Sequence, residues 1–139
     1  MNFVKEKVVE VQDSAGHRLA IILRDAGPRS TAFYTQEQEF IQVGSFTHKA
    51  GTEIQAHTHN DVPRVVHKTQ EVLIIRSGEL SCSVFDENKR LCWSGVLGAG
   101  DVLVLLNGWH GFSVLEDCEF LEVKNGPYIG EADKTRVDL

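Results

Sequence analysis

Short apolar runs separated by turn-forming residues recur along the chain, and this spacing constrains the fold more than any other feature. The intervals are too short to leave room for ordinary helices, and no alternation of strand and long helix is present. The sequence therefore predicts an all-β domain, an antiparallel sandwich or barrel in which closure of the sheet removes unpaired edges. The expected strands cover residues 7–11, 17–24, 39–47, 71–76, 79–86, 91–96, 101–106, 111–115 and 119–124.

The length of 139 residues, of which 42% are hydrophobic, suits one domain with its own core. We expect a single domain over residues 1–139, with N-terminal strands in 1–41 and the main part of the barrel in 42–124. The first two runs are expected to form a hairpin. The polar tail, residues 125–139, is expected to be either a short helix or a loose end.

The formal net charge of −6 argues against nucleic acid as a partner, because phosphate binding needs clustered Lys and Arg and no such cluster is present. Anionic membranes are disfavoured for the same reason. Cys82, Cys92 and Cys118 lie in apolar runs without paired spacing, which indicates buried thiols in a reducing compartment. The N-terminus lacks the apolar core of a signal peptide, and no run is long enough to span a bilayer. We therefore expect a cytoplasmic protein.

The main chemical signal is a pair of histidines one residue apart, His57 and His59. On an extended strand these two side chains project to the same side, near enough to hold one ion. Glu71 opens a later run, in which it shares a face with Leu73 and Ile75, and a carboxylate on an apolar face needs a partner such as a metal ion. A His-x-His pair also arises by chance in unrelated proteins, as surface or hydrogen-bonded residues.

His110 lies at a comparable boundary between a turn and a strand. Three imidazoles and one carboxylate form a mixed nitrogen and oxygen set, which suits a divalent first-row transition metal and leaves positions for water or substrate. We expect Fe, Mn, Ni or Zn to be held by His57, His59, Glu71 and His110.

This spacing resembles the first sequence motif of the cupin superfamily: Gly51, five residues, His57, one residue, His59, and then Glu71, six residues and Gly78. The departure lies at residues 60–70, because cupins commonly place the glutamate three or four residues after the second histidine. We expect this insertion to form a longer loop that sets substrate selectivity.

Residues 100–110 resemble the second cupin motif, in which a glycine, a strand and a turn precede a histidine. Leu106 stands where a proline is usual, and one residue fewer separates Gly108 from His110. The resemblance covers residues 42–124 and implies a double-stranded β-helix, the jelly-roll barrel.

Further segments resemble small bacterial and archaeal cupins associated with surface-polysaccharide gene neighbourhoods, namely QVG at 42–44, TQEVLII at 69–75, WHGF at 109–112 and EVKNGPY at 122–128. The resemblance implies a metal-dependent enzyme of isomerase, dioxygenase or lyase type that acts on a small organic molecule, with a sugar or sugar nucleotide as the expected substrate. Because one fold hosts many activities, a non-catalytic binding or sensing barrel with a structural or absent metal is the alternative. Pairing in small cupins implies a homodimer through residues 7–11 and 17–24.

Two residues are candidate acid or base groups, Glu122 and His67, although a solvated loop histidine is the other interpretation of His67. Arg64, in the same insertion, is a candidate clamp for a carboxylate or phosphate of a ligand, or else an exposed loop residue.

Three further residues are candidates for substrate binding. Trp109 and Phe112 flank His110 and supply apolar wall, although aromatic residues at strand ends also serve core or dimer packing. Lys124 shares a face with Glu122, and this face either lines a polar barrel interior or is solvated.

Overall fold

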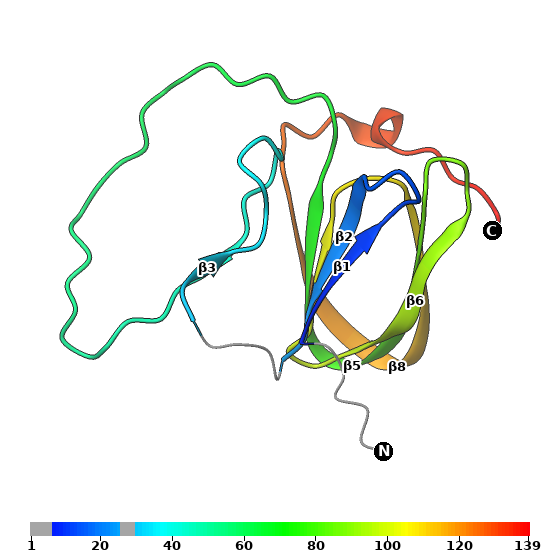
Figure 1. Cartoon of the computed structure of the whole chain (residues 1–139), viewed down its shortest axis with the longest axis horizontal. Coiled ribbons are helices and arrows are strands. Elements are labelled where there is room, and N and C mark those ends of the chain that lie inside the picture. Colours follow the sequence, from blue (N-terminus) through cyan, green and yellow to red (C-terminus); the bar gives the residue numbers. More distant parts are fainter. Residues whose placement is uncertain (1–6, 26–29) are drawn as a thin grey trace.

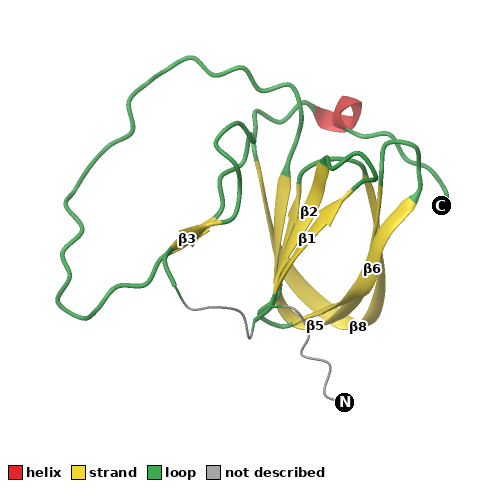
Figure 2. Ribbon diagram, viewed as in Figure 1, coloured by secondary structure: helices red, strands yellow, loops and turns green. Residues whose placement is uncertain are grey.

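The computed structural model describes residues 7–25 and 30–139, and this part of the chain is built mainly from strands (Figure 2). The prediction of an all-β protein is therefore confirmed. The elements are β1 (Val8–Gln12), β2 (Arg18–Leu23), β3 (Ala32–Phe33), β4 (Gly44–Ser45), β5 (Glu71–Phe85), β6 (Leu91–Gly98), β7 (Val102–Leu105), β8 (Trp109–Lys124) and the short 3-10 helix η1 (Gly130–Asp133).

A six-stranded antiparallel sheet forms the body of the protein, and a two-stranded sheet of β3 and β4 lies beside it. The main sheet follows the order β1-β2-β7-β5-β6, and β8 pairs with β5. Figure 1 shows that β5 and β8 curve together, so that the sheet curls into a half-barrel.

Two of the expected breaks between strands are wrong. β5 runs unbroken where strands at 71–76 and 79–86 were predicted, and β8 runs unbroken where strands at 111–115 and 119–124 were predicted. At the centre of β5, Gly78 has a φ of 77°, and the register with β8 shifts between Ile75 and Leu80. A residue in the left-handed region bends the chain there without reversing it. The strand therefore continues through Gly78 and carries the curvature of the half-barrel.

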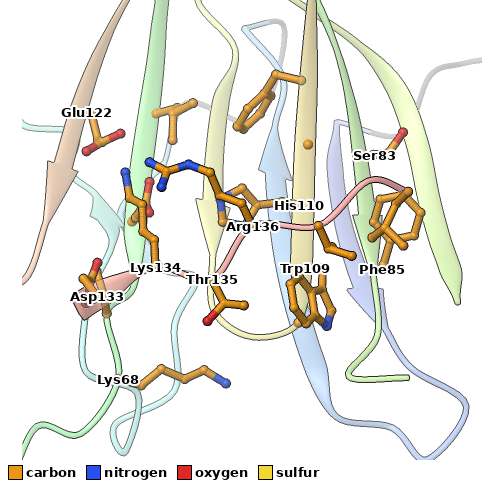
Figure 3. A pocket seen from close by; sticks show the side chains of 18 of the residues that line it. Lys68, Ser83, Phe85, Trp109, His110, Glu122, Asp133, Lys134, Thr135 and Arg136 are labelled. Carbon is orange, nitrogen blue, oxygen red and sulfur yellow. The ribbon is translucent and has the colours of Figure 1, made fainter. Parts of the chain in front are cut away.

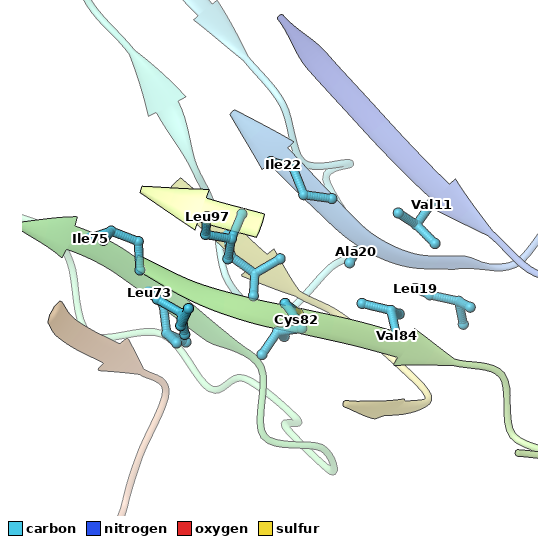
Figure 4. Packing of buried hydrophobic residues seen from close by; sticks show 12 residues of the cluster. Val11, Leu19, Ala20, Ile22, Leu73, Ile75, Cys82, Val84 and Leu97 are labelled. Carbon is cyan, nitrogen blue, oxygen red and sulfur yellow. The ribbon is translucent and has the colours of Figure 1, made fainter. Parts of the chain in front are cut away.

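The hydrophobic core lies inside the curl of the sheet, because one cluster joins residues of β1, β2, β5, β6 and β7. Figure 4 shows side chains of this cluster between β2 and β5. Leu73 and Ile75 from the first half of β5 pack in one cluster with Leu80, Cys82 and Val84 from its second half. The β5 residues of this cluster thus have odd numbers before the bend and even numbers after it, because the bend changes which side chains face the core. Of the three thiols expected to be buried, Cys82 is buried, and burial raises its pKa to about 12, whereas Cys92 and Cys118 are only partly buried.

The β1–β2 hairpin is confirmed, and a side chain closes its turn. Asp13 Oδ1 accepts hydrogen bonds from the backbone amides of Ala15 and His17, at 2.9 and 2.8 Å. The turn-forming residues 25–28, which end the strand expected at 17–24, lie in part outside the described residues.

The segment between β4 and β5 differs most from expectation. The strand predicted over residues 39–47 is reduced to β4, and no strand carries His57 and His59. Residues 46–68, which we name the arm, are exposed throughout and loop away from the sheet (Figure 1). A strand needs a neighbouring strand to pair with, and no strand of the described residues pairs with the arm.

Within the described ranges, no helix is long and apolar enough to cross a membrane.

Candidate functional site

The pairing of β5 with β8 places Glu71 of β5 and Glu122 of β8 on one face. Glu71 lies opposite Lys124, and Leu73 lies opposite Glu122. Residues opposite each other in an antiparallel pair share a face, so these side chains lie on the same side as buried Leu73. Glu71 and Glu122 are therefore on the concave side of the half-barrel.

His110 reaches the same concave side from the other half of β8. It lies opposite Val84, which is fully buried in the core cluster that also contains Leu73. The bend at Gly78 brings the two halves of each strand around one hollow. The concave face therefore carries two carboxyl groups and one imidazole.

These side chains line a broad open cavity of about 1580 Å³ (Figure 3). Its wall includes Glu71, Glu122 and His110, together with the rings of Trp109 and Phe112. Serine, aromatic and charged side chains share the lining, which suits a polar small molecule with an apolar part.

The Glu71 carboxyl group is held in an environment that disfavours its charge. Partial burial raises the pKa of Glu71, and the negative charge of Glu122 raises it further. The positive charges of Lys124 and Lys134 act in the opposite direction. A cation placed between the two carboxyl groups would relieve their repulsion.

His110 favours its neutral form. Burial among the cavity walls lowers the pKa of His110, and the positive charge of Lys134 lowers it further, while Glu122 opposes both effects. The ring still faces open space in the cavity, where its surface is exposed to solvent. A neutral, accessible imidazole is the form that ligates a metal or accepts a proton.

Lys124 pairs with Glu122 on the concave face, with 3.4 Å between Nζ and Oε1. The negative charge of Glu122 raises the pKa of Lys124. Glu122 lines the cavity and is also exposed, so both interpretations of this face stay open, and Lys124 is not among the residues that line the cavity.

His57 and His59 lie next to each other on the arm, away from the cavity. Their ring centroids are 5.4 Å apart, and His57 Nδ1 is 2.9 Å from the carbonyl oxygen of Gln55. No group of three His, Cys, Asp or Glu side chains in the described residues is arranged to hold a metal ion. The structure thus presents the predicted ligands as two sets, His57 with His59 on the arm, and Glu71 with His110 in the cavity.

The remaining candidates divide between the arm and the cavity. Arg64 is exposed on the arm. His67, near the end of the arm, packs its ring edge-on against Phe40 with 4.7 Å between centroids, and it also lines the cavity. Trp109 lies under the Lys89 ammonium group at 5.3 Å, and Phe112 lies 5.7 Å from the His110 ring.

The C-terminal tail contributes cavity residues that the sequence reasoning missed. Lys134 and Arg136 line the cavity, and Figure 3 shows the tail crossing it near His110. The hydroxyl of Thr69 donates a hydrogen bond to Asp133, which ties the tail to the chain just before β5. The sequence did offer a signal for these residues. Lys134 and Arg136 are two residues apart, and an extended chain presents such residues on the same side, where both could face a binding site.

Comparison with known proteins does not assign the chain to a family: no family model, no curated protein and no solved structure matches it.

Proposed function

We propose that the protein is a cupin-type metal-binding barrel that acts on a small organic molecule. The observation that carries this proposal is the convergence of Glu71, Glu122 and His110 on the concave face of one curled antiparallel sheet. The half-barrel supplies the wall of a jelly roll, and the arm supplies chain for the strands that would complete it.

The residues fit a divalent first-row ion in their chemistry. Glu71 and Glu122 repel each other in a partly buried site, and His110 is held neutral, so the cavity set favours a bound cation. His57 and His59 add two adjacent imidazoles once the arm lies against the concave face. The proposed ligands are His57, His59, Glu71 and His110, and the metal is Fe, Mn, Ni or Zn.

An ion in this site would supply Lewis acidity toward a carbonyl or hydroxyl oxygen of the substrate. Glu122 lies beside the ligand Glu71 and can hold or accept a proton next to the bound molecule. Lys134 and Arg136 offer positive charge to an anionic group of the substrate, which is consistent with a sugar nucleotide. Isomerase, dioxygenase and lyase chemistry all suit this arrangement.

A specific observation favours a second candidate, a metal-free binding or sensing barrel. The Lys134 ammonium group interacts electrostatically with both Glu71 and His110, so a protein cation already offsets part of the negative charge of the cavity. In this alternative the cavity recognises a metabolite without changing it.

Metal analysis of the purified protein separates the two candidates. We expect about one equivalent of a first-row metal per chain in the wild type and a loss of at least tenfold in affinity in His57→Ala and His110→Ala, because each substitution removes a ligand. His48→Ala is the matched control, since His48 is also an arm histidine but stacks on Phe46 outside the His-x-His pair. A wild type that takes up no metal on titration would overturn the metal site.

Catalysis is tested separately, by incubating the metal-loaded protein with sugar nucleotides and following product by mass spectrometry and NMR. Turnover that is lost in Glu122→Gln, with metal retained, supports the enzyme. A ligand that binds tightly and is recovered unchanged supports the sensor.

A further inference from the structure

The last strand of the chain, β8, has an unpaired edge in the described structure and exposed apolar side chains. β8 pairs with β5 along one edge, and no other strand of the described chain pairs with its second edge. Its concave face also exposes apolar side chains, with Val114 63%, Phe112 38% and Phe120 38% exposed. A long strand with a free edge and an exposed apolar face is a template for another extended segment.

The arm is an extended segment whose apolar side chains are exposed. It exposes the large apolar residues Phe46, Ile54, Val62, Val65 and Val66. From Lys49 to Val66, the polar and ring contacts in the described structure lie within the arm itself. Its backbone groups and apolar side chains are therefore free to pair with a strand edge.

Charge also matches between the two segments. The arm carries three cations, Lys49, Arg64 and Lys68, against two carboxylates, Glu53 and Asp61, and it holds four histidines. β8 carries one cation, Lys124, against four carboxylates, Glu116, Asp117, Glu119 and Glu122. Lys68 at the end of the arm already pairs with Glu87 of its own body, so the rest of the arm is close to neutral whereas β8 is acidic. Lys49 and Arg64 are the arm cations that can meet the carboxylates of β8, while two copies of the acidic strand repel each other.

We propose that two copies of this chain exchange their arms, so that the arm of each copy adds to the free edge of β8 in the other. Both ends of the arm are held on its own body: Thr47 donates to the hydroxyl of Thr31, and the carbonyl of Lys68 accepts from the side chain of Asn125. Between these ends the arm projects away from the sheet (Figure 1). Because both ends are held, the arm can project from its own body by at most about half of its extended length of roughly 75 Å, which is enough to reach a molecule packed beside it.

Reciprocal exchange fills both free edges with one two-fold operation, which is the usual symmetry of a homodimer. Each arm supplies residues 46–68, within the range of about 20–30 residues per side found in standard interfaces. This interface differs from pairing through β1 and β2, because it uses the opposite end of the sheet.

Exchange makes the metal site composite, and this part of the inference rests on the proposed function. His57 and His59 would come from one copy, and Glu71 and His110 from the other. Neither copy alone would then complete the ligand set, since His57 and His59 are not among the residues that line its own cavity.

Two variants that are each defective test the composite site by complementation. An arm variant, His57→Ala with His59→Ala, is co-expressed with a cavity variant, Glu71→Gln with His110→Ala, under different affinity tags. The heterodimer, isolated through both tags, should bind one metal per dimer, half of the wild-type value, whereas each homodimeric variant binds none. If the wild type binds metal and the heterodimer binds none, the arm docks on its own copy and the exchange is overturned.

A measurement that needs no metal tests the exchange itself. Light scattering should give a dimer for the wild type and a monomer after residues 46–68 are replaced by a short Gly-Ser linker or after Ile54→Asp. Leu91→Asp is the matched control, because Leu91 is similarly exposed, 59% against 68% for Ile54, but lies on β6. Circular dichroism checks that each variant is folded.

A monomeric wild type, or a folded linker variant that remains dimeric, would overturn the exchange. An arm-dependent dimer that binds no metal would support the exchange and reject the proposed function.

Discussion

Glu71 and Glu122 place two carboxyl groups against each other across β5 and β8, on the concave face of the half-barrel. Neither strand could hold this arrangement alone, because the pairing register brings together residues that are far apart in sequence. Like charges in a partly buried position are unfavourable unless a cation or a proton is shared between them. This pair is the feature on which the proposed metal site mainly rests.

The raised pKa of Glu71 predicts a pH dependence of stability. The folded protein binds a proton at Glu71 more readily than the unfolded chain, so the stabilising contribution is present below the ordinary pKa of 4.5. It is lost as the pH rises through the raised pKa of the folded state. Glu71→Gln should therefore raise the free energy of unfolding at pH 8, by about 0.5–1 kcal/mol after solvent screening, and have little effect at pH 4.

Urea unfolding of the metal-free protein at the two pH values measures this difference. Glu79→Gln is the control, because Glu79 lies on the same strand but is exposed. Equal effects of Glu71→Gln at pH 4 and pH 8 would contradict the electrostatic origin of the change.

Lys134 is predicted to lower the pKa of His110. Its positive charge lowers the pKa of His110, so Lys134→Ala should move that pKa upward, while burial keeps it below the ordinary value. NMR titration of the imidazole resonances measures the shift. Lys89→Ala serves as the control, since Lys89 lies over Trp109, the neighbour of His110, and does not contribute to the pKa shift of His110. An unchanged His110 titration in Lys134→Ala would show that the tail does not lie over the cavity in solution.

Gly78 is predicted to be the least replaceable glycine of the sheet. Its φ of 77° disfavours any side chain, and an added Cβ would overlap the backbone of Asp117 and Cys118 on β8. Gly78→Ala should lower the free energy of unfolding by about 2 kcal/mol or more.

Gly98→Ala is the matched control for that substitution, because an added Cβ at Gly98 meets nothing within 4 Å. Its effect should stay within about 0.5 kcal/mol. Similar stabilities of the two variants in urea would show that β5 does not bend at Gly78.

The short strands were predictable where a turn reverses the chain. Local sequence predicts the β1–β2 hairpin, β6 and β7. Asp13 follows the end of β1, and Gly98 and Gly100 mark the turn between β6 and β7. At Gly78 the same signal misled, since a glycine with positive φ either reverses a strand or bends it. Only the pairing partner, β8, decides between these outcomes.

The candidate site was predictable in its residue types more than in its arrangement. Glu71 and His110 were identified from their positions at the start of apolar runs, and the structure places both in the cavity. The strand expected for His57 and His59 is absent, because no neighbouring strand of the described residues pairs with this segment. The sequence could not show this, since its periodicity does not reveal whether a partner strand is available. The contribution of Lys134 depends on where the tail lies, which local sequence does not specify.

The most direct test of the account is a crystal structure of the metal-loaded protein with the ion identified by anomalous scattering. The account predicts one ion per cavity, bonded to Glu71 and His110 of one copy and to His57 and His59 of an exchanged arm. An ion bonded elsewhere, or a cavity without an ion while the arm stays free of β8, would contradict it.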